Sequence, residues 1–165
     1  MIKLDTFYLE KLDIAEKHYG LIEGMSLDKK VKAYIDRDFF VWLGKHQAIS
    51  DDKIEVGKMY AVIKDGREIG VVGSSGDLED GILNVVCAIK KNVRDRGYGT
   101  KLLEEVTFYY LENIKGIKGI KLVIDQSNKA SRGIAINNGF VKIDGVNEVG
   151  LEEWYYSKSR IRERK

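Results

Sequence analysis

The fold is decided by the stretch Arg94-Asp95-Arg96-Gly97-Tyr98-Gly99-Thr100, which lies where an apolar run ends and a helix-period pattern begins. Gly97 and Gly99 have no Cβ, so the backbone can turn tightly and bring successive N–H groups close to a ligand. The first N–H groups of the following helix have no intrahelical partner, and the helix dipole adds roughly 0.3–1 kcal/mol for an anion there. Arg94 and Arg96 can add charge-assisted hydrogen bonds. The stretch predicts a phosphate site, with a plain strand-to-helix turn as the alternative.

Strand and turn signals alternate in the segment before this stretch. Two apolar runs, 60–63 and 69–72, flank a polar segment in which Asp65-Gly66 is a strong hairpin-turn signal. Residues 74–81 are rich in turn formers, so we expect a turn there. The run 82–89 is almost continuously apolar, which suits a strand buried on both faces. We expect this strand at the centre of the sheet.

After the stretch, strand and helix patterns alternate again. Apolar residues recur at helical spacing to about Asn113, and Gly116 and Gly119 then break the chain. Residues 121–125 read as a short strand, which a right-handed crossover should place parallel to the central one. A helix is expected from Lys129 to Asn138, capped by Asn128, and strands are expected at 140–143 and 154–156.

Charge-rich patterns of helical period in the N-terminal third predict two helices, over 9–19 and 27–40, followed by a loop at 45–57. Ser26 and Asp28 are plausible caps for the second helix. The order of elements indicates an α/β (α+β) fold with a central mixed sheet and helices on both faces. With 165 residues, the chain is expected to form a single domain over 1–165.

Composition narrows the classes of partner. Twenty-eight basic and 26 acidic residues nearly balance, so no overall field favours nucleic acid, and no apolar run reaches the roughly 20 residues of a membrane span. Cys87 is the only cysteine, which excludes an intrachain disulfide and suits a reducing compartment. A cytoplasmic protein without nucleic-acid or membrane partners is expected, and a homodimer stays open. Residues 158–165 form a basic tail that is expected to be solvated.

Two separated motifs make the chain resemble the GNAT superfamily of acetyl-CoA-dependent N-acetyltransferases, best over residues 60–144. The first motif is R/Q-x-x-G-x-G/A, here Arg94-x-x-Gly97-x-Gly99 after the strand 85–89. The second is Asn128-x-x-Ser131 followed by Asn138-Gly139-Phe140. The resemblance implies the GNAT-like acyl-CoA N-acyltransferase fold with acetyl-CoA as cosubstrate.

By this resemblance, the central strand diverges from its parallel neighbour and takes the pantetheine arm of the coenzyme like an extra strand. The backbone of Cys87 and Ile89 then bonds the acetyl and pantetheine amides, and Asn128 bonds the arm with Ser131 beside it. The pyrophosphate lies among the amides of Arg94, Asp95, Arg96, Gly97, Tyr98, Gly99 and Thr100. Independently, Asn128 follows the carboxyl end of a parallel strand, where open α/β sheets place ligands; its alternative role is a plain helix cap.

The chain departs from the family's pattern at the usual catalytic positions. The usual glutamate base is replaced by Leu83 and the usual tyrosine acid by Ala135. A lysine-like amine has a pKa of about 10.4, so deprotonating it at neutral pH costs roughly 4 kcal/mol. A general base or a desolvating site must lower this cost. The candidates are Asp125 as base and Tyr155 as acid. Glu79 or Asp80 could serve as the base instead, a water chain could relay the proton, and Tyr156 could serve as the acid.

Covalent and metal chemistry are not expected. Cys87 lies in an apolar run without an adjacent histidine, which is typical of a structural cysteine. His18 and His46 are isolated, and no residues have the spacing of metal ligands.

The predicted function is the transfer of an acetyl group from acetyl-CoA to a primary amine of a small molecule, peptide or protein. The amine attacks directly in a ternary complex. The alternative is a CoA-binding sensor or interaction module without turnover, because the usual base and acid are missing. Aromatic residues can form the walls of the acceptor site, so at least one of Trp42, Tyr155 and Tyr156 is expected to border it.

Overall fold

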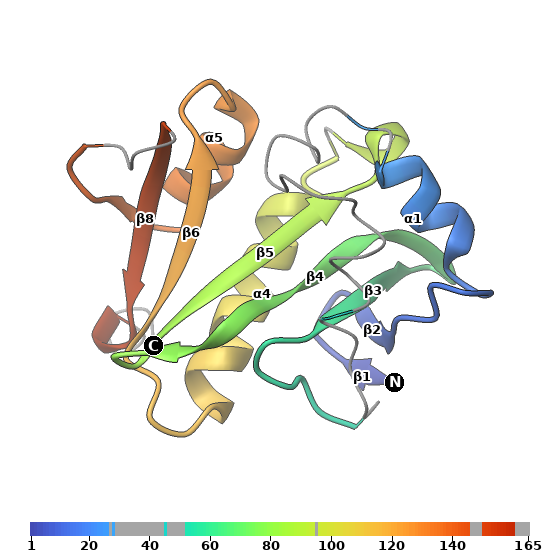
Figure 1. Ribbon diagram of the computed structural model, residues 1–165, viewed down its shortest axis with the longest axis horizontal. Coiled ribbons are helices and arrows are strands. Elements are labelled where there is room, and N and C mark those ends of the chain that lie inside the picture. Colours follow the sequence, from blue (N-terminus) through green and yellow to red (C-terminus); the bar gives the residue numbers. More distant parts are fainter. Residues whose placement is uncertain (27, 29–44, 46–51, 95, 146–149, 161–165) are drawn as a thin grey trace.

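The computed structural model describes residues 1–26, 28, 45, 52–94, 96–145 and 150–160. These residues form a mixed sheet in the order β1-β2-β3-β4-β5-β6-β8-β7, with helices packed against it (Figure 1). The strands β5 and β6 run parallel, and the other neighbours are antiparallel. The strands are β1 (Ile2–Lys3), β2 (Tyr8–Lys11), β3 (Met59–Lys64), β4 (Arg67–Glu79), β5 (Ile82–Ile89), β6 (Gly119–Asp125), β7 (Val141–Lys142) and β8 (Leu151–Ser157). The helices are α1 (Tyr19–Ser26), α4 (Tyr98–Asn113) and α5 (Lys129–Asn137), with short 3-10 turns η1 (Lys91–Val93) and η2 (Lys158–Arg160).

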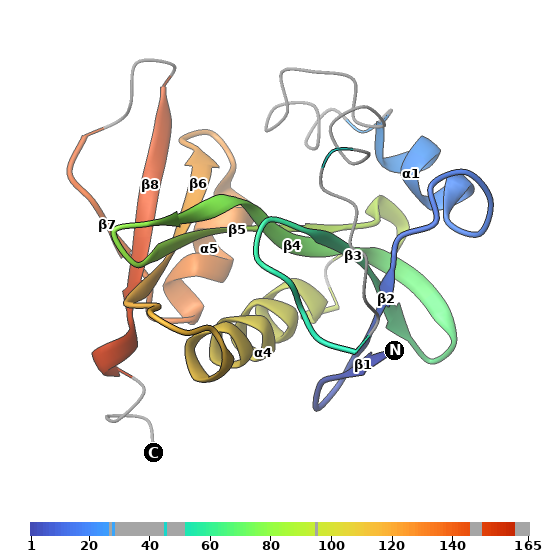
Figure 2. The ribbon, with the colours of Figure 1, turned by 60° about the horizontal axis from the view of Figure 1, so that its bottom comes forward.

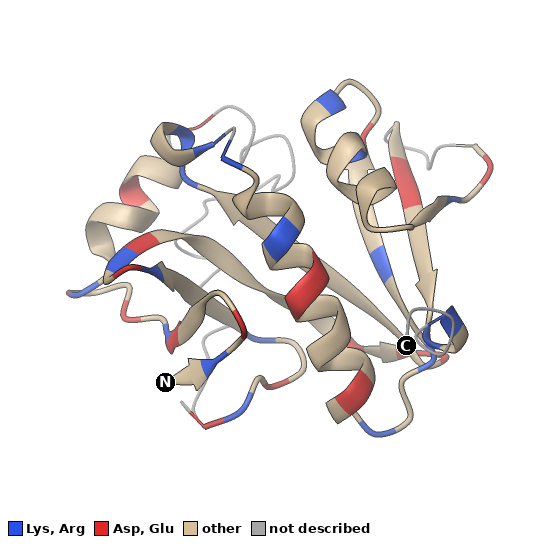
Figure 3. Ribbon diagram, turned by 180° about the vertical axis from the view of Figure 1, so that it is seen from behind, with Lys and Arg blue, Asp and Glu red and all other residues tan. Residues whose placement is uncertain are grey.

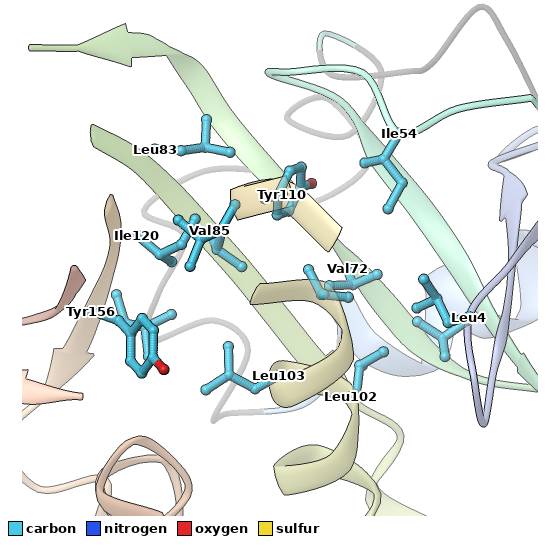
Figure 4. Packing of buried hydrophobic residues seen from close by; sticks show 14 of the residues in the cluster. Leu4, Ile54, Val72, Leu83, Val85, Leu102, Leu103, Tyr110, Ile120 and Tyr156 are labelled. Carbon is cyan, nitrogen blue, oxygen red and sulfur yellow. The ribbon is translucent and has the colours of Figure 1, made fainter. Parts of the chain in front are cut away.

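Alternating side chains of the sheet supply two cores, one on each face. Tyr60 and Val62 of β3 belong to the larger core, which the sheet forms with α4 and α5 (Figure 4). Their neighbours Met59 and Ala61 belong to a smaller core with α1. Figure 2 shows α1 on the opposite side of the sheet from α4 and α5. The predicted mixed sheet with helices on both faces is confirmed.

The elements around the central strand follow the sequence patterns closely. The hairpin of β3 and β4 turns at Asp65-Gly66, both with positive φ, and β5 has the predicted bounds at the centre of the sheet. The expected turn at 74–81 is wrong for most of its length, because β4 continues to Glu79 and the turn is confined to Asp80-Gly81. Ser74, Ser75 and Glu79 of this stretch pair with β5, with a register irregularity between Ser75 and Glu79. Cross-strand pairing outweighed their turn propensity.

The N-terminal prediction needs a larger correction. The expected helix over 9–19 is wrong, because Tyr8–Lys11 is strand β2, paired with β3, and the helix α1 begins only at Tyr19. Pairing with the sheet buries Leu9 completely, which outweighs a weak local helix pattern. The helix predicted over 27–40 lies outside the described residues, apart from Asp28.

The parallel pair β5 and β6 is joined over a short length. The two strands pair only from Ile82 opposite Gly119 to Asn84 opposite Lys121. Beyond these rungs, β5 continues to Ile89 and β6 to Asp125, and Figure 1 shows the two strands spreading apart toward their carboxyl ends. The divergence leaves one edge of β5 unpaired by β6, and this edge positions the candidate site.

Two remaining expectations concern the membrane and the tail. Within the described ranges, no helix has the length and apolarity of a membrane span. The tail is ordered at its start, because the Arg160 guanidinium lies over the Tyr156 ring and donates to the carbonyl of Gly139. The expectation of a solvated tail is therefore wrong for Arg160, whereas Lys158 and Ser159 are exposed.

Replacing Gly24 by alanine is expected to raise the free energy of unfolding by about 0.5–1 kcal/mol, because Gly in a helix costs about that much relative to Ala. Gly24 is exposed on α1, and a Cβ there meets nothing within 4 Å. The control is Gly66→Ala, at a site equally open but with φ +76°, where alanine is expected to destabilise by about 1 kcal/mol. Urea unfolding measures both, and equal effects of the two variants contradict the prediction.

Candidate functional site

The free edge of β5 presents backbone groups to the space beside β6. The Lys90 N–H donates to the Ile69 carbonyl of β4. Since successive residues of a strand point their N–H and C=O groups to opposite sides, those of Cys87 and Ile89 point away from β4. They lie beyond the last rung shared with β6. This edge can accept and donate hydrogen bonds to an extended chain that carries amides.

The turn between η1 and α4 has the geometry that the glycines predicted. Gly97 is left-handed, with φ 77°, and it precedes α4 without a side-chain cap. The first N–H groups of α4 therefore have no intrahelical or side-chain cap and point out of the helix end. This geometry agrees with the predicted tight turn, and the binding of an anion to its backbone stays a prediction.

The two sequence motifs meet at this turn. A Cβ added to Gly99 lies 2.7 Å from Cδ1 of Ile134 in α5 and 3.9 Å from Cγ1 of Ile89 in β5. The Asn138 amide nitrogen donates to the Thr100 carbonyl at 3.1 Å, which ties the end of α5 to the first turn of α4. Gly99 is thus the point of close approach between α4, α5 and the free strand edge.

Asn128 has the cap role that was its alternative reading. Its Oδ1 accepts from the Ser131 N–H at 3.1 Å, and it follows the carboxyl end of β6 within three residues. The cap holds the N-terminus of α5 next to the diverging strands. A role for Asn128 and Ser131 in binding the pantetheine arm stays a prediction.

Arg94 does not reach toward the turn with its side chain. Its Nε donates to the Ile89 carbonyl at 3.0 Å, and its terminal nitrogen forms an ion pair with Asp28. The Arg94 side chain thus bonds the carbonyl that was predicted to bond the coenzyme. Arg96 is exposed, and Asp95 lies outside the described residues. The part of Arg94 in anion binding stays a prediction.

The candidate base and acid lie at opposite ends of β6. Asp125 is partly exposed at its carboxyl end, where Ser127 hydrogen bonds from Oγ at 2.6 Å and from N at 2.9 Å lower the pKa of its carboxyl. Tyr155 lies against Gly119 at the amino end, with its hydroxyl 3.4 Å from the Lys118 carbonyl. Seven strand residues separate these ends by roughly 20 Å, so the two side chains cannot serve one reaction centre together.

Each catalytic assignment stays a prediction that a variant can test, although the two cannot hold together. Asp125→Asn or Tyr155→Phe should lower kcat at least about tenfold for the one residue that transfers a proton. The lowered pKa makes Asp125 a weaker base than an ordinary aspartate. An unchanged kcat removes the residue from the mechanism.

The two positions that replace the family's usual base and acid are buried. Leu83 and Ala135 are both 0% exposed and belong to the core under the sheet. Burial raises the pKa of the Cys87 thiol to about 12, so a thiolate is scarce at neutral pH, in agreement with a structural role.

Of the three aromatic candidates for the acceptor wall, Tyr156 packs in the core against Phe140 and is 1% exposed. Trp42 lies outside the described residues. Tyr155 is the candidate that remains partly exposed, at the amino end of β6. The expected acceptor wall stays a prediction for Tyr155 and Trp42.

The sequence reasoning missed two polar features near the site. Asn84 donates to Ser75 Oγ at 3.0 Å, and this pair lies on the sheet face that is opposite to Leu83 and Val85. Asp28 forms an ion pair with Arg94. The helix that Asp28 was expected to cap lies outside the described residues. An asparagine in an otherwise apolar run is a sequence signal for the hydrogen bond between Asn84 and Ser75. The pair of Arg94 and Asp28 joins residues that are 66 positions apart, and no sequence pattern predicts it.

No cluster of metal-ligating side chains occurs among the residues that the structure describes. His18 is buried, with its Nδ1 accepting from the Asp13 N–H at 2.8 Å and its Nε2 at 3.0 Å from Glu10. Both ring nitrogens are therefore engaged within the fold, which is a structural role.

Comparison with known proteins agrees with this geometry. The protein-family model described as "Acetyltransferase (GNAT) domain" matches residues 22–141, most of the chain. No curated protein matches the chain in sequence. Among solved structures, a spermidine N-acetyltransferase from Vibrio cholerae, in complex with CoA and spermine, has a TM-score of 0.75 at 14% identity over 93% of this chain and 96% of its own.

Two further solved structures have similar folds. An aminoglycoside acetyltransferase in complex with coenzyme A and kanamycin has a TM-score of 0.72 at 17% identity, covering 97% of this chain and 100% of its own. An acetyltransferase from Agrobacterium tumefaciens has a TM-score of 0.74 at 11% identity, covering 94% and 92%. At these identities the structures establish a shared fold.

Proposed function

Since the chain belongs to the GNAT acetyltransferase family and is thus an acetyl-CoA-dependent acyltransferase, we propose that it acetylates a primary amine by direct attack in a ternary complex. The observation that carries the proposal is the free edge of β5, which ends beside a glycine turn at a helix N-terminus. Relatives of known fold bind CoA together with kanamycin or spermine, both amines, which supports an amine acceptor for this chain.

The described residues fit the coenzyme. The pantetheine arm carries two amides, and the backbone groups of Cys87 and Ile89 can pair with them as a neighbouring strand would. For this pairing, the Arg94 Nε must release the Ile89 carbonyl. The amides of residues 96–100 then hold the pyrophosphate. The missing Cβ of Gly99 lets this turn pack closely against Ile134 of α5.

Acetyl-CoA supplies a thioester carbonyl that a neutral amine can attack. The chain's contribution is to hold the two reactants in line and to exclude water. Positioning the two reactants in this way raises the reaction rate by a large factor. A thiol with a pKa near 8.5 is a fair leaving group, so the reaction does not require the usual acid. The proton of the amine leaves to a carboxylate or through water.

Thiol release tests the proposed function. The protein is incubated with acetyl-CoA and a panel of polyamines, aminoglycosides, amino acids and peptides, and free CoA thiol is measured. We expect turnover with at least one amine, with the acetyl group found on that amine by mass spectrometry. Tight CoA binding without turnover across the panel contradicts the proposal and favours the second candidate, a CoA-binding sensor. The buried Leu83 and Ala135 at the usual catalytic positions are the observation in favour of that candidate.

Asn128 offers a test that separates its cap role from a ligand role. Asn128→Ala is expected to lower the free energy of unfolding by about 1 kcal/mol, because it removes the acceptor for the Ser131 N–H. Asn128→Asp keeps that acceptor and should retain stability, but it loses the amide donor and should weaken CoA binding about tenfold. Thermal unfolding and calorimetry measure the two effects. Full CoA affinity in Asn128→Asp leaves Asn128 as a cap only.

A further inference from the structure

A pocket of about 330 Å³ adjoins the glycine turn on the side where β5 faces β4. It is lined by the basic residues Lys64, Arg67, Lys90 and Arg96, together with Asp65 and Glu68. Four cations against two anions leave a net positive lining. The volume is near the lower end for ligand sites, so it suits a small charged group rather than a whole nucleotide.

The fold brings these cations together from three segments that are distant in sequence. Lys64 and Arg67 face each other across the end of the β3–β4 hairpin. Lys90 follows β5 and is fixed beside the hairpin by its N–H bond to Ile69. Arg96 comes from the glycine turn. Figure 3 shows these basic segments at the end of the hairpin and between β5 and α4.

Most of this positive charge is not neutralised within the described part of the chain. Lys64 lies 3.6 Å from the Asp65 carboxylate. The side chains of Arg67, Lys90 and Arg96 form no ion pair or hydrogen bond with any residue that the structure describes. Like charges gathered without partners repel one another, and a bound anion removes that cost.

The pocket is continuous with the proposed pyrophosphate site. Arg96 and Tyr98 line the pocket and also belong to the turn, and the Tyr98 ring is held edge-on against Phe7 at 6.1 Å. A ligand on the turn amides that carries a second phosphate on an adjacent sugar can therefore reach these cations.

We propose that this pocket binds the 3′-phosphate of coenzyme A, an inference that rests on the proposed function. In CoA the pyrophosphate and the 3′-phosphate are attached to the same ribose, which matches a turn and a basic pocket that share Arg96. The 3′-phosphate is a doubly charged monoester, and arginine and lysine bind such groups through charge-assisted hydrogen bonds.

The test compares CoA with 3′-dephospho-CoA, which lacks only this phosphate, by calorimetry at fixed ionic strength. The wild-type protein should bind CoA at least about tenfold more tightly than dephospho-CoA. In the double variant Arg67→Ala/Lys90→Ala, that preference should fall to about twofold or less, with the affinity for dephospho-CoA unchanged. Lys115→Ala, just beyond the opposite end of α4, is the control for loss of positive charge and should retain the preference.

Each other outcome overturns the inference. Equal wild-type affinity for the two ligands means that the 3′-phosphate is not recognised. An equal loss of both affinities in the double variant means that the pocket acts on another part of the ligand or on the fold, which urea unfolding distinguishes. If the wild-type protein binds neither ligand, the proposed function itself fails, and this result is distinct from the other two.

Discussion

Replacing Gly99 by valine is expected to weaken the binding of acetyl-CoA and of CoA alike by about 100-fold. The side chain enters the point where α4, α5 and the free edge of β5 approach, next to the turn amides that are proposed to receive a phosphate. Arg94→Ala and Arg96→Ala should each lose less, because the turn binds chiefly through its backbone. Calorimetry measures the affinities.

The matched control for Gly99→Val is a double variant with Ile134→Val. The nearest atom to the added Cβ is Cδ1 of Ile134, at 2.7 Å, and Ile134→Val removes that methyl group alone. If valine at 99 acts by pushing α5 away, the double variant should recover CoA affinity. We expect it to recover stability but not affinity. Recovery of both, or full affinity in Gly99→Val alone, removes the turn from the binding site.

Gly70→Ala is expected to lower the free energy of unfolding by about 3 kcal/mol, a large fraction of the stability of an ordinary domain. Gly70 pairs with Ile89, and a Cβ there meets the backbone carbonyl of Ala88. Backbone atoms cannot rotate out of the way as the end of a side chain can, so β4 and β5 must shift. Gly24→Ala, in open space, is the control with the opposite sign.

This variant also links stability to the site. A shift of Ala88 and Ile89 moves the strand edge that is proposed to pair with the coenzyme. We therefore expect CoA binding to weaken in whatever fraction of Gly70→Ala remains folded. Urea unfolding gives the stability, and a loss under 1 kcal/mol contradicts the close packing of these strands at this position.

The sequence predicted the part of the fold that local signals encode strongly. The hairpin turn Asp65-Gly66, the apolar run 82–89 and the left-handed Gly97 each restrict the backbone by themselves, and the structure agrees at each. The strand β2 was missed because its identity depends on pairing with β3, fifty residues away. The extension of β4 through Ser75 was missed for the same reason.

The candidate site also has features that the sequence could predict and features that it could not. The close approach at Gly99 and the cap at Asn128 arise from neighbours in sequence or from the two motifs, so patterns could predict them. The pairing of Arg94 with Asp28 and the gathering of Arg67 and Lys90 beside Arg96 arise from tertiary structure. Sequence spacing carries no signal for contacts of that kind.

The central claim is that coenzyme A lies along the free edge of β5 with its pyrophosphate on the turn before α4. Its most direct test is a titration of the ¹⁵N-labelled protein with CoA, followed by amide chemical shifts. The account predicts the largest shifts at Cys87, Ile89 and residues 96–100, with smaller ones at the start of α5. Saturable binding that leaves these amides unchanged and shifts others contradicts it.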